Sequence, residues 1–220
     1  MKIRLISLVV STALLAAVPA LTFAHGAGQT AAAATAPAPS QLVMDNATRI
    51  LSTLDSRRAE FTTDRAALQK FISGEFDQMF DSKYAAQLVL GRHGRGAPDA
   101  EVNRFAKALT NNLMARYGSS LLDFNTRLKV RIKSETPLRG GSMVKVSSEF
   151  IRQGGDPIPV DYLMHKVGNK WMAFDVMVEG VSFVQTFRNQ FDGPLSRQSI
   201  DAVSAELESG KLQPNANTGS

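Results

Sequence analysis

The spacing of apolar side chains separates a helical half of the chain from an extended half. From Ser40 onward, apolar residues recur every three or four positions, which is the period of an amphipathic helix. Ser40 is a suitable N-cap for the first helix, and Thr63 or Asp64 for the second. The pattern predicts four helices, over residues 40–54, 63–76, 80–90 and 98–121.

The period changes to two after residue 126. Residues 127–133 alternate polar and apolar side chains without interruption, which predicts a strand with one buried face. Three more alternating segments follow, separated by turns at residues 137–141 and 154–157 and by the tight hairpin pair Gly168-Asn169. The predicted strands are residues 127–133, 144–150, 158–164 and 172–178, with Phe174 and Val176 on the same apolar face.

Two helices are predicted after the strands. Gly180 ends the last strand, an apolar stripe then runs from Phe183 to Phe191, and Pro194 stops this helix. A final amphipathic helix covers residues 196–209. The expected fold class is therefore α+β, with N-terminal helices, a four-stranded antiparallel meander and C-terminal helices.

The N-terminal segment has the features of a secretory signal. Lys2 and Arg4 precede an apolar run over residues 5–18, and small residues precede a cleavage site before His25. The alternative is an uncleaved anchor, but the run is shorter than the roughly 20 residues that span a bilayer. We expect an exported, soluble protein with these parts: a signal peptide at 1–24, an Ala/Pro-rich linker at 25–40, one folded domain at 41–211 and a disordered tail at 212–220.

Composition narrows the function classes. The chain has 44% hydrophobic and 20% charged residues, as globular proteins do, and no cysteine, which excludes disulfides and thiolate chemistry. Its three histidines fit no metal-ligand spacing, so no metal is expected. Without Lys2 and Arg4 the net charge falls from +5 to +3, spread along the chain, which argues against a nucleic-acid partner.

No catalytic constellation is visible, and we expect a protein that is not an enzyme and has no cofactor. The glycine-rich segment 91–96 follows a helix rather than a strand, so a basic surface loop is a better interpretation than a phosphate cradle. Asp175 and Glu179 flank the last strand, but Asp175 is predicted to face away from the apolar side, with Arg188 as its structural partner.

Several blocks in the second half of the chain resemble one family. Leu88-Val89-Leu90-Gly91 comes first, followed by Phe105 and Tyr117 on the next helix. The more specific blocks are Pro157-Ile158-Pro159-Val160-Asp161-Tyr162, Lys170-Trp171-Met172-Ala173-Phe174-Asp175-Val176, Val178-Glu179-Gly180-Val181-Ser182-Phe183-Val184 and Phe187-Arg188-Asn189-Gln190-Phe191. Their order and spacing resemble the MlaC family of periplasmic phospholipid-binding proteins, also called toluene-tolerance proteins.

The resemblance extends from about Leu42 to Lys211, with two departures. Arg92-His93-Gly94 stands where the family often has a tryptophan, and Phe187 replaces the usual tyrosine. The resemblance implies a periplasmic phospholipid carrier that helps to maintain the lipid asymmetry of the outer membrane. The implied partners are an outer-membrane lipoprotein–porin complex and an inner-membrane ABC transporter with its substrate-binding domain.

Such a carrier needs a deep apolar pocket. Exposing two acyl chains to water would cost on the order of 20 kcal/mol at about 0.8 kcal/mol per methylene. Covering both chains requires a pocket at the upper end of the usual volume range. The headgroup can stay in water, so weak headgroup selectivity is expected.

We predict that the apolar strand face and the segment after it line this pocket. Tyr162, Val178, Phe183 and Phe187 are the leading positions, with aromatic rings at the mouth. The full set of predicted lipid-binding residues is Val146, Val160, Tyr162, Met164, Val176, Val178, Val181, Phe183, Phe187 and Phe191. Two alternatives remain open: a structural envelope protein whose core is filled, and a small-molecule isomerase or hydrolase with a similar cone-shaped fold.

Overall fold

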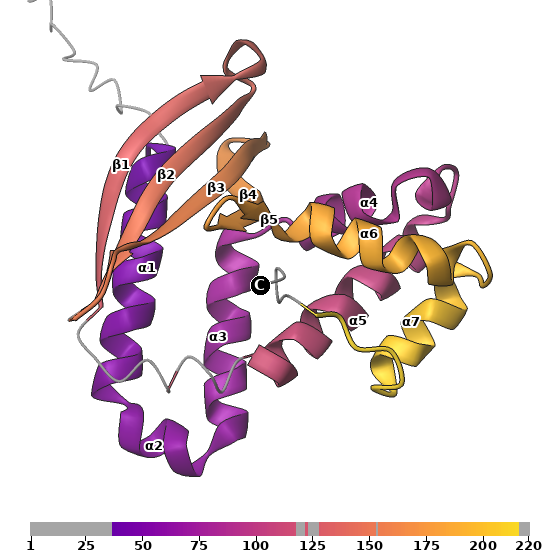
Figure 1. Cartoon of the computed structure of the whole chain (residues 1–220), viewed down its shortest axis with the longest axis horizontal. Helices are drawn as coiled ribbons and strands as arrows, with labels where there is room; N and C mark the ends of the chain where they lie inside the picture. The colour runs from indigo at the N-terminus through magenta and orange to yellow at the C-terminus, as the bar shows by residue number, and fades with distance from the viewer. Residues whose placement is uncertain (1–36, 118–121, 123–127, 153, 216–220) are drawn as a thin grey trace, which may run out of the picture. The chain divides into compact units, whose positions relative to one another are not determined.

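Helices stand before and after a single antiparallel sheet in the computed structural model (Figure 1). The structure describes residues 37–117, 122, 128–152 and 154–215, so the predicted signal peptide and most of the linker lie outside the described residues. The α-helices are α1 (Pro39–Ser56), α2 (Arg58–Thr63), α3 (Arg65–Met79), α4 (Ser82–Leu90), α5 (Asp99–Tyr117), α6 (Phe183–Leu195) and α7 (Ile200–Glu208). The strands are β1 (Lys129–Leu138), β2 (Met143–Ile151), β3 (Ile158–Val167), β4 (Lys170–Val178) and β5 (Val181–Ser182).

The predicted α+β class is confirmed, with one more strand than expected. The sheet order follows the chain from β1 to β5, and all neighbours are antiparallel. The extra strand, β5, is only two residues long and forms because the chain turns back at Gly180, so that Val181 pairs with Val178. None of the described helices combines the length and hydropathy needed to cross a bilayer.

The first hairpin is longer than predicted. Pro137 was expected in a turn, but it belongs to β1 and pairs with Val144 of β2. The turn is reduced to the short 3₁₀ segment Arg139–Gly141. A proline is tolerated here because β1 is an edge strand, where one backbone donor is not needed for pairing.

A β-bulge changes which face of the sheet Phe174 joins. Leu163 pairs with Asp175, but Met164 pairs with Ala173, so Phe174 is the unpaired extra residue. The sequence predicted Phe174 on the same face as Val176, and this is wrong because a shift of one residue exchanges the two faces. The Phe174 ring instead lies edge-on to Tyr84 of α4, with ring centroids 5.2 Å apart.

Helix α1 and the end of α3 pack on the other face of the sheet, and α2 connects these two helices. Near the start of α1, Val43 is fully buried against the strand residues Val146 and Met164. Further along the helices, a second cluster joins Leu54 of α1 to residues of α2 and α3, including Phe61. The short helix α2 was not predicted, because six residues are too few to show a helical period.

Local capping explains where two of these helices begin. The Asp64 carboxylate accepts a hydrogen bond from the Ala67 amide at 2.9 Å, which makes Asp64 rather than Thr63 the N-cap of α3. The Asp81 carboxylate likewise accepts from the Tyr84 amide at 2.9 Å at the start of α4. The expected cap at Ser40 is wrong, since α1 starts one residue earlier with a proline in its first turn.

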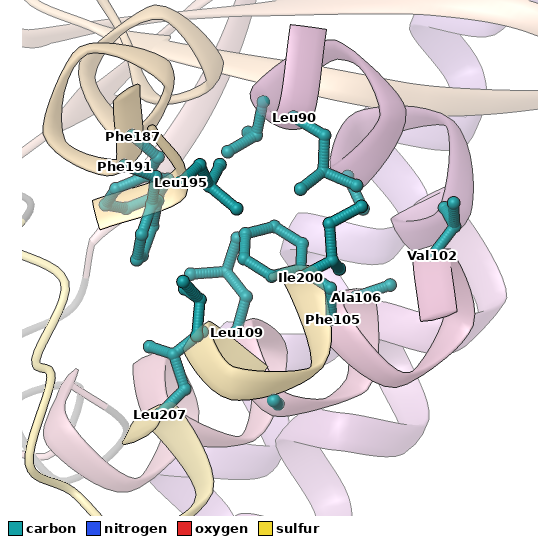
Figure 2. Close-up of a cluster of buried hydrophobic side chains, with 14 residues drawn as sticks. Leu90, Val102, Phe105, Ala106, Leu109, Phe187, Phe191, Leu195, Ile200 and Leu207 are labelled. Atoms are coloured by element: carbon teal, nitrogen blue, oxygen red, sulfur yellow. The ribbon is translucent and has the colours of Figure 1, made fainter. Parts of the chain in front are cut away.

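Helices α4 to α7 form a core of their own (Figure 2). Phe105 of α5 and Phe191 of α6 meet edge-to-face, with ring centroids 5.4 Å apart, and both are almost completely buried. Helix α6 ends at Leu195, so Pro194 lies inside its last turn rather than before its end. Helix α7 starts at Ile200 rather than residue 196, where the Ser199 hydroxyl caps it.

A buried polar network joins β4, β5 and α6. The Asp175 carboxylate accepts hydrogen bonds from the Ser182 hydroxyl at 2.5 Å and the Val184 amide at 3.0 Å, in place of the predicted Arg188 partner. Ser182 also caps α6 by accepting from the Gln185 amide at 3.0 Å. Burial raises the pKa of the Asp175 carboxyl above its ordinary value, while these hydrogen bonds act in the opposite direction.

This network leads to a stability prediction for two capping serines. Ser199→Ala removes only the cap of α7 and is expected to cost about 1 kcal/mol. Ser182→Ala also removes a donor from the buried Asp175 carboxylate, so we expect a loss of about 2 kcal/mol. Urea denaturation followed by circular dichroism measures both losses, and equal costs for the two variants would contradict the network.

Candidate functional site

An apolar cavity of about 790 Å³ lies between α1 and the inner face of the sheet. Its helical wall consists of Asn46, Ala47, Thr48, Ile50, Leu51, Ser52, Leu54 and Asp55 from α1, with Arg58 from α2 and Ile72 from α3. Its other wall consists of Leu128, Lys129, Val130, Phe150, Ile158, Val160, Tyr162 and Val178 from the sheet region. The volume falls in the upper part of the range for ligand pockets.

The cavity lies between two packed clusters. Tyr162 lines the cavity and also packs against the cluster around Val43. Leu54 and Ile72 line it as well and belong to the cluster that joins α1, α2 and α3. The walls therefore continue into well-packed core on both sides, which fixes the shape of the space between them.

The lining is apolar inside and polar where it meets solvent. Thr48, Ser52 and Asp55 of α1 are exposed lining residues, and so is Lys129 at the start of β1. The cavity therefore reaches the surface between α1 and β1. An apolar interior with a polar mouth suits an amphipathic ligand whose polar end remains in water.

Tyr162 places the hydroxyl of its ring in this apolar environment. This hydroxyl has no hydrogen-bond partner among the described residues. Burial raises the pKa of the Tyr162 hydroxyl to about 12, so the side chain is neutral at physiological pH.

A polar brace ties α1 to α3 beside the cavity. The Glu75 carboxylate on α3 is buried and accepts hydrogen bonds from the Arg49 Nε at 2.9 Å and from the Asn46 Nδ2 at 3.0 Å. The Arg49 Nη2 also lies 2.8 Å from the Glu75 carboxylate. Because Asn46 lines the cavity, this brace holds one of its walls in place.

The structure places the predicted lipid-binding residues in three different environments. Val160, Tyr162 and Val178 line the cavity. Val146 and Met164 are completely buried in the cluster around Val43, because α1 packs directly on this part of the strand face. Lipid contact stays a prediction for all of these residues.

The remaining predicted positions lie outside the cavity lining. Val176 pairs with Tyr162 on the neighbouring strand, and Val181 pairs with Val178. The aromatic stripe of α6, formed by Phe183, Phe187 and Phe191, belongs to the cluster of α4 to α7, where Figure 2 shows Phe187 and Phe191 pointing among the other helices.

Sequence reasoning missed the contribution of α1 to the cavity. Ile50 and Leu54 lie on the helix predicted over residues 40–54, but they were not among the predicted lining residues. The apolar periodicity of α1 correctly predicts which face of the helix turns inward. On that basis, α1 could have been considered as a wall of the pocket. It carries no information on whether that face packs tightly or lines a space.

His165 lies away from the cavity. His165 Nε2 is 3.0 Å from the Asp81 carboxylate and stacks on Tyr84, on the face of the sheet that meets α4. Among the described residues, no three His, Asp or Glu side chains are grouped closely enough to hold a metal ion.

Comparisons with known proteins agree on one family. The family model described as MlaC protein matches residues 44–209. The intermembrane phospholipid transport system binding protein MlaC of Haemophilus influenzae is 21% identical over 179 residues, covering 80% of this chain and 83% of that protein. Toluene tolerance protein ttg2D of Pseudomonas putida is 23% identical over 189 residues, covering 86% of this chain and 82% of that protein.

A solved structure has the same fold. It is the phospholipid-binding protein from Ralstonia solanacearum in complex with a phospholipid, with a TM-score of 0.69 and 19% sequence identity. The similarity covers 77% of this chain and 94% of the other.

The brace beside the cavity leads to a second stability prediction. Glu75→Ala leaves the Asn46 amide and the Arg49 guanidinium without their charged acceptor, and we expect a loss of about 2 kcal/mol in the free energy of unfolding. Glu208→Ala breaks an exposed ion pair with Arg104 and is expected to cost less than about 1 kcal/mol. Urea denaturation of both variants tests the difference, and a Glu75→Ala cost no larger than the control would refute the brace.

Proposed function

The chain belongs to the MlaC family, and from this premise we propose that it is a phospholipid carrier. The proposed binding site is the cavity between α1 and the sheet, with the acyl chains inside and the headgroup at the mouth beside Asp55 and Lys129. The observation that supports this most directly is the apolar cavity itself, in a fold shared with a phospholipid-bound protein.

The size of the cavity is compatible with this ligand. A methylene group occupies nearly the volume of a water molecule in the liquid, roughly 30 Å³, so about 26 such groups fill a space of 790 Å³. At about 0.8 kcal/mol per methylene, this number of groups corresponds to roughly 20 kcal/mol of hydrophobic transfer free energy. The cavity can therefore shield most of two acyl chains from water.

Transfer between a membrane and this cavity needs little net free energy. Acyl chains move from one apolar surrounding to another, so the exchange is nearly balanced, and the proteins that donate and receive the lipid set its direction. Under this proposal the protein binds no cofactor and catalyses no reaction. A core filled throughout, as in the structural alternative, does not fit a cavity of this size.

The proposed partners are two membrane complexes. We assign the carrier to the periplasm, between an outer-membrane lipoprotein–porin complex and an inner-membrane ABC transporter with its substrate-binding domain. The name of the Haemophilus influenzae relative, an intermembrane phospholipid transport system binding protein, supports a place in such a route. Its proposed role there is to maintain the lipid asymmetry of the outer membrane.

Filling the cavity is expected to prevent lipid binding. Val178 lines the cavity on β4, and Val178→Trp places a bulky ring in the space of the acyl chains. Val167 is exposed near the β3–β4 turn, so Val167→Trp adds the same ring outside the cavity. We expect native mass spectrometry of detergent-free periplasmic protein to show bound phospholipid in wild type and Val167→Trp, and at least a tenfold lower bound fraction in Val178→Trp.

Circular dichroism establishes that both variants are folded. If a folded Val178→Trp protein keeps its phospholipid, the binding site does not include this part of the cavity. A wild-type protein that carries no lipid, even after incubation with phospholipid vesicles, would overturn the proposed function.

A further inference from the structure

Two opposite charges stand on opposite walls of the cavity mouth. Asp55 is in the last turn of α1 and Lys129 is the first residue of β1; both are exposed, and both line the cavity. No ion pair or hydrogen bond of either side chain exists among the described residues, including one between them. The two charges therefore face the same opening but are separated by a gap.

Their lack of partners contrasts with the other charged residues on the same elements. On β1, Arg131 and Lys133 both pair with Glu149, and the Glu135 carboxylate accepts from the Ser40 amide. On α1, Arg49 pairs with Glu75, and Asp45 accepts a hydrogen bond from Gln41. Among the charged side chains of α1 and β1, Asp55 and Lys129 are thus the two without a partner in the described part of the chain, and they can interact with solvent or with a ligand.

Asp55 stands at the end of a helix, and neither an ion pair nor a hydrogen bond of its side chain is present among the described residues. A helix presents the negative end of its dipole at its C-terminus, so a carboxylate in the last turn of α1 is unfavourable. The two basic residues that follow the helix, Arg57 and Arg58, have other partners: Arg57 pairs with Glu60, and Arg58 donates a hydrogen bond to the Leu122 carbonyl oxygen. A carboxylate kept at an unfavourable position on the rim of a binding cavity points to a cationic group of the ligand.

We infer that the mouth recognises a zwitterionic headgroup, with Lys129 binding the phosphate and Asp55 binding the ammonium group. This inference rests on the proposed function and adds a headgroup preference to it. An ethanolamine headgroup carries a negative phosphate and a positive ammonium group, held apart by a two-carbon link. Like Asp55 and Lys129, its two charges are opposite in sign and separated. The headgroup can therefore bridge the gap between the two walls, which the side chains of Asp55 and Lys129 do not close on their own.

Arg58 lines the cavity from the helical wall, the same wall that carries Asp55. Its guanidinium Nη1 donates a hydrogen bond to the Leu122 carbonyl oxygen at 2.7 Å, which fixes the side chain beside the cavity. The phosphate is common to zwitterionic and anionic phospholipids, which leaves Asp55 as the group that distinguishes between them.

A competition experiment tests the inference on the mature full-length protein. The lipid-free protein is incubated with vesicles of equal amounts of phosphatidylethanolamine and phosphatidylglycerol with identical acyl chains, and the bound lipids are counted by native mass spectrometry. Wild type is expected to favour phosphatidylethanolamine about threefold, the effect of one solvent-exposed ion pair. High salt should reduce the preference, because exposed charges are screened.

The two charge variants are expected to shift the ratio in opposite directions. Asp55→Asn removes the ammonium contact and brings the bound ratio close to one. Lys129→Gln removes a charge that repels the ammonium, so it raises the share of phosphatidylethanolamine above the wild-type value. Neither variant should lower stability, since neither side chain has a partner among the described residues.

Two matched variants control for net charge. Asp45→Asn removes a negative charge from α1, and Lys170→Gln a positive charge from the start of β4, both at residues that do not line the cavity. These controls should keep the wild-type ratio. A wild-type ratio of one, or an Asp55→Asn ratio equal to wild type, overturns the headgroup inference while lipid binding stands. Failure of the wild-type protein to take up either lipid overturns the proposed function instead.

Discussion

The way in which α1 crosses the sheet determines whether the molecule contains a cavity. At Val43 the helix packs directly on the strands, and the side chain is fully buried against Val146 and Met164. Between Asn46 and Asp55, the same helix lines open space. A rod-like helix can follow a twisted sheet over only part of its length, so close contact at one end opens a gap at the other. The gap is wide enough for a ligand because α1 is held there by α3 as well as by the sheet.

An empty apolar space weakens a protein, because the atoms that line it lose their van der Waals partners on one side. The wall of the cavity therefore depends on contacts outside it. The Arg49–Glu75 pair and the cluster around Phe61 provide them, between α1 and the helices α2 and α3. A proposed carrier needs such a frame, since its walls must keep their positions both with and without cargo.

Much of the fold could be predicted because its determinants are local. Asp64 and Asp81 cap the helices that follow them, and the alternation of polar and apolar residues locates the strands. The face of Phe174 could not be predicted, because the bulge depends on how β4 pairs with β3 rather than on the sequence of β4 itself. For the same reason, Pro137 was expected in a turn, whereas its pairing with Val144 makes it part of an edge strand.

The candidate site was predicted less well, and the reason is tertiary. Two apolar stripes, one on α1 and one on α6, were equally able to face the sheet. The structure assigns Ile50 of α1 to the cavity and Phe187 of α6 to the core of α4 to α7. Hydrophobic periodicity shows that a residue is turned inward, but whether it meets another side chain or an open volume depends on segments far apart in the chain.

The division of the hydrophobic core into separate clusters has a consequence for motion. The cluster that includes Phe105 and Phe191 involves helices α4 to α7, whereas the clusters that border the cavity draw mainly on α1 to α3 and the strands, with Leu122 and the end of α5 at Met114 added. Separate clusters can open in separate steps, each with its own free energy. The amides of α7 and those of α1 are therefore expected to exchange with solvent as two units, each with its own free energy of opening.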